Sequence, residues 1–149
     1  MLLRFDFTDD EATHFKLLSD LCKNASRSDF VDIIQSWDTA RLCLLSRRLV
    51  VLRPAEQLED FECLYYGDEL QERFGADFTG YRFADVPELE EIRKSLDAFR
   101  QVALHKMPHF SRISRTERDP EGIDYTRILY PVLKGGSTRL VVGIMVFLD

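Results

Sequence analysis

The sequence has few cysteines, and no cysteine pattern that points to a disulfide framework or a metal site. Among its 149 residues are only Cys22, Cys43 and Cys63, which are widely spaced and form no CxxC pair. Each stands among Leu, Val, Ile or Tyr neighbours, as small core thiols do. We therefore expect reduced, buried cysteines in a protein of the cytoplasm.

A signal for export and a membrane-spanning apolar run are also missing. The N-terminal MLLRFDFTDDE carries acids where a signal peptide has a basic start and an apolar stretch. The longest apolar run, Leu140 to Leu148, has the length of a strand. A formal net charge of −6 disfavours non-specific binding to nucleic acid. We expect a soluble cytoplasmic protein without a membrane or nucleic-acid partner.

The common catalytic motifs are absent too. No GxSxG, GxxxxGK[ST] or GxGxxG sequence occurs, and Ser137 after two glycines is best interpreted as part of a hairpin turn. Acids cluster at one predicted helix start, where they offset the helix dipole: Asp85, Glu88, Glu90 and Glu91. The histidines are His14, His105 and His109; the last two have HxxxH spacing, but Pro108 between them ends the predicted helix, so they do not share a helical face. These features predict that the protein is not an enzyme.

What the sequence does contain is clear helical periodicity near its start. Thr8 and Glu11 have the spacing of a capping box, and they predict a helix over residues 8–25. Its apolar face comprises Phe15, Leu18, Leu21, Cys22 and Ala25. A second short helix is predicted from Ser28 to Trp37. Residues 41–53 fit either a helix end plus a strand or two strands, and Pro54 ends the element.

The middle of the chain predicts a strand, a short helix and a long helix. Residues 61–65 alternate as a strand that stops at Gly67, and residues 68–74 form a helix closed by Gly75. Both glycines end elements where a positive φ is expected. Residues 87–107 give the longest amphipathic helix. Its apolar face comprises Leu89, Ile92, Leu96, Phe99 and Ala103.

The last forty residues predict three antiparallel strands, at 110–118, 123–133 and 138–148. The third is apolar on both faces: Leu140, Val142, Ile144 and Val146 on one, Val141, Met145 and Phe147 on the other. Such a strand needs a cover on each face. The long helix supplies one cover, and the N-terminal helix or a second copy of the chain supplies the other. Gly143 in mid-strand indicates either a bulge or the close approach of a helix or ligand.

A group of arginines on the first of these strands is predicted to be solvated. Arg112, Arg115 and Arg118 are interleaved with Glu117 and Asp119. Taken together, the order of elements predicts an α+β fold, with helices on an antiparallel sheet of about five strands. The chain is short enough for one domain, in which residues 1–38 form a helical segment and residues 39–149 the core.

Several segments resemble the PAS domain, in particular the stand-alone bacterial PAS proteins. The matching residues are the strand 60–67 ending in glycine, the FGADFTG at 74–80, and Ile128-Leu129-Tyr130-Pro131-Val132 with Val142-Gly143. The resemblance covers roughly residues 61–148, with residues 1–60 matched in outline. Members of this group often place an arginine where Leu64 stands, so its role is not carried over. The resemblance implies a sheet with a long connecting helix on one face and N-terminal helices on the other.

The resemblance also implies a pocket between the sheet and the helices. Its lining, and hence the predicted ligand-binding residues, would be Cys63, Tyr65, Phe74, Phe78, Tyr81, Phe83, Phe99, Tyr130 and Met145. A filled core is the alternative. The loop after Gly75 lacks the cysteine of covalent flavin photosensors, and no histidine matches a haem ligand, so the cofactor is unknown.

The function that follows is a sensor or regulatory module that binds a small molecule or a partner protein. Its signal would leave through the N-terminal helices or a homodimer contact, for which the apolar face of residues 8–25 is the best candidate. A ligand-free interaction module is the first alternative. An isomerase or hydratase of the NTF2-like type is the second, and it would need a carboxylate or histidine pointing into the pocket.

Overall fold

The computed structural model describes residues 7–25, 45–85, 90–113 and 124–147. The helices are α1 (Asp9–Ala25), the 3-10 turn η1 (Ser46–Arg48), α4 (Asp68–Phe74), the 3-10 turn η2 (Phe83–Asp85) and α5 (Glu90–His105). The strands are β1 (Leu49–Pro54), β2 (Phe61–Tyr66), β3 (His109–Ile113), β4 (Tyr125–Lys134) and β5 (Ser137–Phe147). The expected short helix from Ser28 to Trp37 and residues 114–118 of the strand predicted at 110–118 lie outside the described residues.

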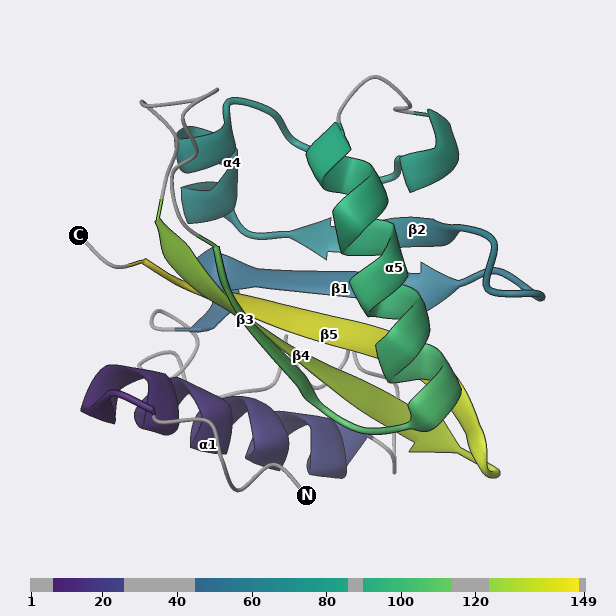
Figure 1. Ribbon diagram of the computed structural model, residues 1–149, viewed down its shortest axis with the longest axis horizontal. Coiled ribbons are helices and arrows are strands. Elements are labelled where there is room, and N and C mark those ends of the chain that lie inside the picture. The colour runs from purple at the N-terminus through teal and green to yellow at the C-terminus, as the bar shows by residue number, and fades with distance from the viewer. Residues whose placement is uncertain (1–6, 26–44, 86–89, 114–123, 148–149) are drawn as a thin grey trace.

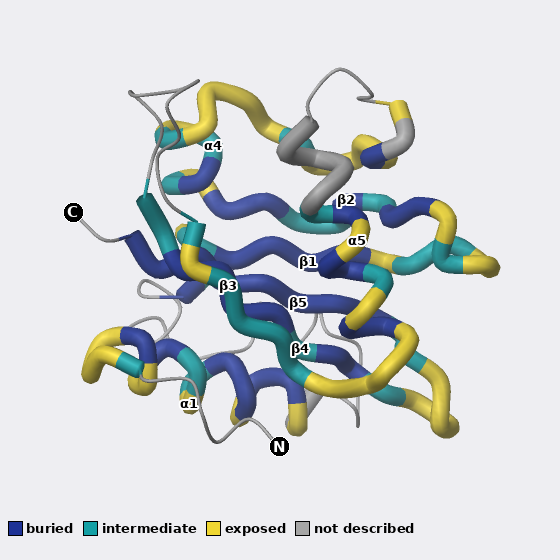
Figure 2. The backbone as a smooth tube through the Cα atoms, viewed as in Figure 1, coloured by how far each residue is buried: buried dark blue, intermediate teal, exposed yellow. Residues whose placement is uncertain are grey.

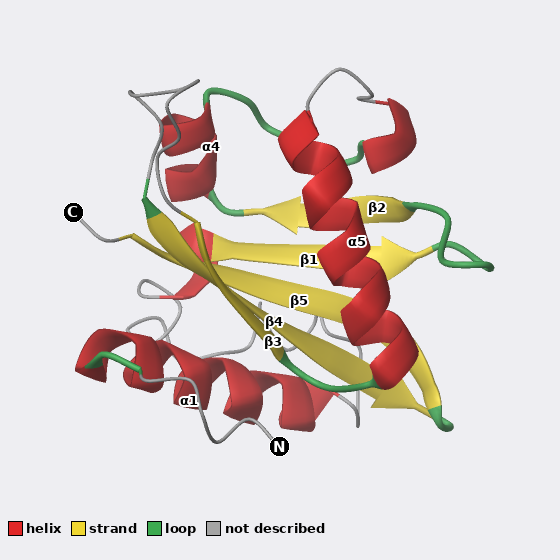
Figure 3. Cartoon of the chain, in the orientation of Figure 1, coloured by secondary structure: helices red, strands yellow, loops and turns green. Residues whose placement is uncertain are grey.

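All five strands belong to one antiparallel sheet with the order β2-β1-β5-β4-β3 (Figure 1). The helix α5 crosses one face of this sheet, and α1 packs against β4 and β5 from the other face. Figure 3 shows α4 and the loop after it beside the β2 end of the sheet. This arrangement confirms the predicted α+β fold, including the long helix on one face and an N-terminal helix on the other.

The β5 strand is buried on both faces, as its sequence predicted. Val141, Met145 and Phe147 lie under α5, whereas the alternating set Leu140, Val142, Ile144 and Val146 lies under α1. Figure 2 shows the central strands as a continuous buried band between the two helices. A strand buried on both faces is stable only with a cover on each, and here one chain supplies both covers.

The apolar face of α1 packs on the sheet of its own chain. Leu18, Leu21 and Cys22 are buried against it, and Phe15 is half-buried. These four residues thus face the sheet of their own chain. Since this face of α1 is occupied, a homodimer contact would have to use another part of the surface, and dimerisation stays a prediction.

The structure tests what the sequence predicted for three glycines. Gly75 has a φ of 77°, which confirms the left-handed helix end expected there, but Gly67 has a φ of −60° and the expectation for it is wrong. A Cβ on Gly143 would lie 2.8 Å from Val50 Cγ1 and 2.9 Å from Leu129 Cδ2. The close approach at Gly143 thus comes from side chains of the two neighbouring strands, whose pairing with β5 is continuous there.

The start of α1 is a reciprocal capping box. The Thr8 backbone N–H donates to Glu11 Oε1 at 2.9 Å, and the Glu11 backbone N–H donates to Thr8 Oγ1 at 3.2 Å. Two backbone donors that lack partners inside the helix are thereby satisfied.

Alanine at Thr8 is expected to lower the free energy of unfolding by about 1 kcal/mol, because the cap to the Glu11 backbone is lost. Urea denaturation followed by circular dichroism measures the change. Thr13→Ala is the matched control, since the Thr13 hydroxyl is exposed and donates to the Asp9 carbonyl of its own helix. That control should be neutral or slightly stabilising. Equal losses in the two variants would show that the cap contributes nothing specific.

Candidate functional site

The candidate site is the set of side chains between the sheet and α5, which we call the α5-facing layer. Its buried members come from every strand except β3 and from α4, η2 and α5: Val50, Leu52, Phe61, Cys63, Tyr66, Leu70, Phe83, Leu96, Ala98, Phe99, Val102, Ala103, Leu129, Val141, Met145 and Phe147. Rings link the layer together, since Phe99 lies 5.6 Å from both Phe61 and Phe83 between ring centroids. These ring contacts form a close-packed aromatic cluster within the layer.

The second layer lies under α1, and we call it the α1-facing layer. Its buried members are Leu18, Leu21, Cys22, Leu45, Leu49, Val51, Ile128, Val132, Leu140, Val142, Ile144 and Val146. The sheet separates the two layers, because alternate residues of the same strands point to its opposite faces.

The nine residues predicted to line one pocket do not share one layer. Cys63, Phe83, Phe99 and Met145 are buried in the α5-facing layer, and Phe78 packs against it. Tyr65 and Tyr130 instead pack against the α1-facing layer. Phe74 and Tyr81 are 36% and 54% exposed. The structure thus brings five of the nine together on one face, and their role in ligand binding stays a prediction.

A β-bulge explains why Tyr65 leaves the predicted face. The register between β1 and β2 shifts, so that Val51 pairs with Tyr65 and Leu52 with Cys63. The extra residue, Leu64, reverses the alternation of β2 at that point. The Tyr65 hydroxyl then donates to the Ser46 carbonyl at 2.8 Å, so its polar end is satisfied within the protein.

The α5-facing layer holds one charged residue that sequence analysis missed. Arg127 on β4 is only 6% exposed, and its Nη1 donates to Ser95 Oγ of α5 at 2.8 Å. The guanidinium also lies 5.8 Å from the centre of the Phe99 ring. Its Nε has no hydrogen-bond partner, and no carboxylate in the described part of the chain pairs with it. Burial lowers the pKa of Arg127, since the charged form loses its hydration.

On the β3 side, the neighbours of Arg127 are polar as well. Ser111 on β3 is its cross-strand partner, so the two side chains lie on the same face. Ser111 Oγ is 3.3 Å from His109 Nδ1. Burial lowers the pKa of His109, and the positive charge of Arg127 lowers it further. At neutral pH the cluster therefore carries the charge of Arg127 alone.

On the opposite face of the same strands, Glu11 anchors α1 to the sheet. Glu11 is fully buried, and both of its carboxylate oxygens accept hydrogen bonds from Arg112, at 2.8 Å from Nη2 and 3.3 Å from Nε. The Thr126 hydroxyl also donates to Glu11. These contacts, Arg112 first, lower the pKa of Glu11 from 4.5 to about 2 against the opposing effect of burial. Arg112, predicted to be on a solvated face, is thus half-exposed but tied to a buried acid.

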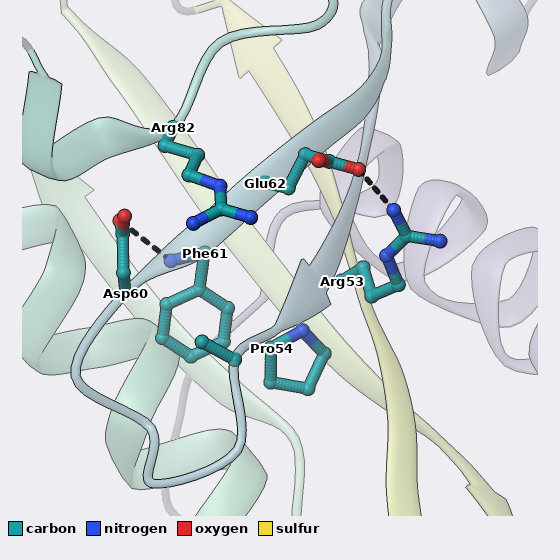
Figure 4. Close-up of a pocket in the computed structure, with 7 residues that line it drawn as sticks. Arg53, Pro54, Asp60, Phe61, Glu62 and Arg82 are labelled. Atoms are coloured by element: carbon teal, nitrogen blue, oxygen red, sulfur yellow. Dashed lines mark hydrogen bonds and ion pairs between the residues drawn. The ribbon is translucent and has the colours of Figure 1, made fainter.

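A small surface pocket lies at the end of the β1–β2 hairpin. It has a volume of about 70 Å³ and is lined by Arg53, Pro54, Ala55, Asp60, Phe61, Glu62 and Arg82. Figure 4 shows the Arg53–Glu62 ion pair on one side, and Asp60 accepting from the Phe61 backbone N–H on the other. This volume suits a few water molecules and is too small for most metabolites.

The two described cysteines are unsuited to nucleophilic chemistry. Cys22 and Cys63 are buried free thiols, as the sequence predicted. Burial raises the pKa of Cys63 to about 12 and that of Cys22 still further, so both stay protonated at neutral pH. Within residues 7–25, 45–85, 90–113 and 124–147, no group of three or more His, Cys, Asp or Glu side chains is placed to hold a metal ion. In the same residues, no helix is long and apolar enough to span a bilayer.

Comparison with known proteins identifies the fold. No protein-family model matches the chain, and no curated protein matches it. Among solved structures, a fungal LOV domain photoreceptor aligns with a TM-score of 0.50 at 15% identity, over 88% of this chain and 99% of that one.

Two further structures align less well. A domain of an HTR-like protein from Haloarcula marismortui gives 0.48 at 14% identity, over 68% of this chain and 98% of its own. The PAS domain of the histidine kinase ThkA gives 0.47 at 12% identity, over 66% and 97%. At 15% identity the likeness to the photoreceptor shows fold alone: the chain has a PAS-like fold, as its sequence motifs predicted.

Proposed function

We propose that this chain is a sensory or regulatory module of PAS type, whose input acts on the α5-facing layer and whose output is the docking of α1. One observation carries the proposal. Thr126 and Arg127 are consecutive residues of β4, and they bind helices on opposite faces of the sheet. Thr126 donates to Glu11 of α1, and Arg127 donates to Ser95 of α5.

The neighbouring strand repeats this arrangement. Arg112 pairs with Thr126 across the two strands and also binds Glu11, whereas Ser111 pairs with Arg127 on the face toward α5. A displacement of β3 and β4 caused on the α5 side would therefore move the groups that hold α1. Packed interfaces of this kind switch between discrete arrangements, which is how small shifts at one site become changes at another. In this way a small molecule or a partner protein would produce a signal at the N-terminal helix.

A ligand-free interaction module is the second candidate, and the close-packed aromatic cluster around Phe99 favours it. Native mass spectrometry of the freshly purified protein, with an absorption spectrum alongside, separates the two. A mass in excess of the chain that is lost on denaturation supports the sensor, whereas a bare mass favours the interaction module. The same spectrum reports whether the protein is a homodimer.

The coupling itself is tested by a double-mutant cycle between Ser95→Ala on α5 and Glu11→Gln on α1. We expect the two losses of unfolding free energy to differ from additivity by about 0.5–1 kcal/mol, because both variants disturb the same two strands. Urea denaturation of the single and double variants gives the value.

Thr138→Val is the matched control for Ser95→Ala. The Thr138 hydroxyl donates to the Ala103 carbonyl at 2.7 Å, so this variant also removes one bond between the sheet and α5. Combined with Glu11→Gln, it should be additive. Additivity in both cycles would contradict the proposed route across the sheet.

A further inference from the structure

We infer that Arg127 is the anchor of a binding site for the carboxylate of a small organic acid, held between α5 and the edge of the sheet formed by β3 and β4. This inference rests on the proposed function, since it names the chemical class of the molecule that the module would detect. It starts from Arg127, which is only 6% exposed and has no counter-ion among the described residues.

A buried arginine without a carboxylate is unusual because its charge loses hydration and gains nothing equivalent. Proteins pair such groups or satisfy all of their donors. Here Ser95 takes one donor, the Phe99 ring gives a weak attraction, and Nε–H has no acceptor. An anion bound during function would supply both the missing acceptor and the missing charge.

The charge of the site selects the type of anion. Among the described residues Arg127 is its single positive charge, because burial and the charge of Arg127 lower the pKa of His109. One arginine balances a monoanion, whereas a phosphate dianion would leave a buried negative charge. A carboxylate also matches the planar fork of a guanidinium, and it can accept from two donors side by side.

The surroundings indicate how the rest of the molecule would be held. Ser95 Oγ accepts from the guanidinium at 2.8 Å, and Ser111 lies on the same face of the sheet as Arg127, so both hydroxyls can donate to an acid bound on this face. The guanidinium lies 5.8 Å from the centre of the Phe99 ring, so the site adjoins the apolar α5-facing layer. β3 is an edge strand with half-buried residues, so the cluster borders the surface on that side, and we place the entry of the acid there.

The test measures the binding of hexanoate by isothermal titration calorimetry at constant ionic strength. Arg127→Met keeps the length and apolar stem of the side chain and removes the charge. We expect it to weaken hexanoate binding by at least about tenfold, the loss of one charge-assisted hydrogen bond. The neutral probe 1-hexanol should bind equally to the wild type and to Arg127→Met.

Arg82→Met is the matched control, since it removes one arginine charge from an exposed position. It should change hexanoate affinity by less than about twofold, as screening of a distant surface charge predicts. Thermal unfolding of Arg127→Met should give a midpoint equal to or above that of the wild type, because an unpaired buried charge has been removed.

Three results would overturn the inference. They are equal hexanoate affinity in the wild type and Arg127→Met, no binding of hexanoate up to about 10 mM, or a strongly lowered unfolding midpoint for Arg127→Met. The last would show that the guanidinium has a counter-ion within the chain. Ser95→Ala gives a second measurement in a milder variant, and it should weaken hexanoate binding several-fold.

Failure of this inference and failure of the proposed function give different experimental results. A retained neutral molecule that binds Arg127→Met as well as the wild type would leave the sensor intact and refute the carboxylate site. Hexanoate binding that depends on Arg127 but leaves hydrogen exchange of the α1 amides unchanged would establish the site and contradict the proposed output.

Discussion

Glutamine in place of Glu11 is expected to lower the free energy of unfolding by about 2–3 kcal/mol, the range for a buried hydrogen-bonded charge. The carboxylate is fully buried and accepts from both Arg112 nitrogens and the Thr126 hydroxyl. An amide has one acceptor oxygen and would turn its NH₂ toward one of these donors. Arg112 is half-exposed and can regain water, which keeps the loss below that of a fully buried pair.

The same substitution should remove a large part of the acid sensitivity of the fold. The pKa of Glu11 is 4.5 ordinarily and about 2 in the folded protein. A lowered pKa gives stability that is complete above the unfolded value and is lost as pH falls through the folded value. Wild-type stability should therefore fall between about pH 5 and pH 2 more steeply than that of Glu11→Gln.

Urea midpoints measured from pH 7 down to pH 3 give both effects. Glu62→Gln is the matched control, because its ion pair with Arg53 lies at the surface and contributes about 0.5 kcal/mol or less. Hydrogen exchange of residues 9–25 would locate the change in α1. Parallel pH profiles for the wild type and Glu11→Gln would refute the assignment of a buried, ionised anchor.

Alanine at Gly67 is expected to cost about 3 kcal/mol or more, the upper range for forcing atoms into a packed site. The new Cβ would lie 2.3 Å from the Arg47 carbonyl oxygen and 2.5 Å from that of Ser46. These are backbone atoms of η1, so no side chain can rotate away to make room. The backbone at Gly67 has a φ of −60° and a ψ of 149°, which any residue adopts, so the cost comes from contact and not from backbone strain.

The close contact at Gly67 has a structural purpose. It brings the first turn of α4 against η1, where Arg47 Nε donates to Asp68 Oδ1 at 2.9 Å and Arg48 pairs with Glu69. The Gly67 N–H donates to the Leu49 carbonyl at 2.9 Å, which ties the end of β2 to the start of β1. Alanine there should loosen the junction of β1, β2 and α4 together.

Gly80→Ala is the matched control, because its cost comes from backbone conformation and not from close contacts. Gly80 has a φ of 87° and open space around the position of a Cβ, so alanine there should cost about 1 kcal/mol through backbone strain alone. Urea denaturation compares the two. A loss at Gly67 no larger than that at Gly80 would show that η1 yields easily and that the contact does not constrain the fold.

Much of the architecture was readable from local pattern. The capping box at Thr8, the glycine that closes α4 and the two apolar faces of β5 all appear in the structure as predicted. Each depends on neighbours in the sequence or on a simple period, which are the features that a sequence displays directly. The PAS-like motifs added the connection between these elements.

The composition of the candidate site was less predictable. Tyr130 pairs with Val142 and so faces α1, although its sequence allows either face because β4 is apolar on both. Tyr65 changes face through a bulge that no residue type announces. Which strand face meets which helix is set by register, and register depends on pairings between distant segments.

By itself, the sequence determined the class of fold, the helices α1, α4 and α5, the alternation of β5 and the lack of familiar catalytic motifs. Only the tertiary structure decided that Glu11 meets Arg112 and that Arg127 is buried beneath α5, with no carboxylate partner among the described residues. The reason is that a charged side chain is buried only when other residues fold over it. The residue that binds Glu11 lies about a hundred positions away in the sequence, and the one that binds Arg127 lies 32 positions away. No local sequence pattern encodes contacts between such distant residues.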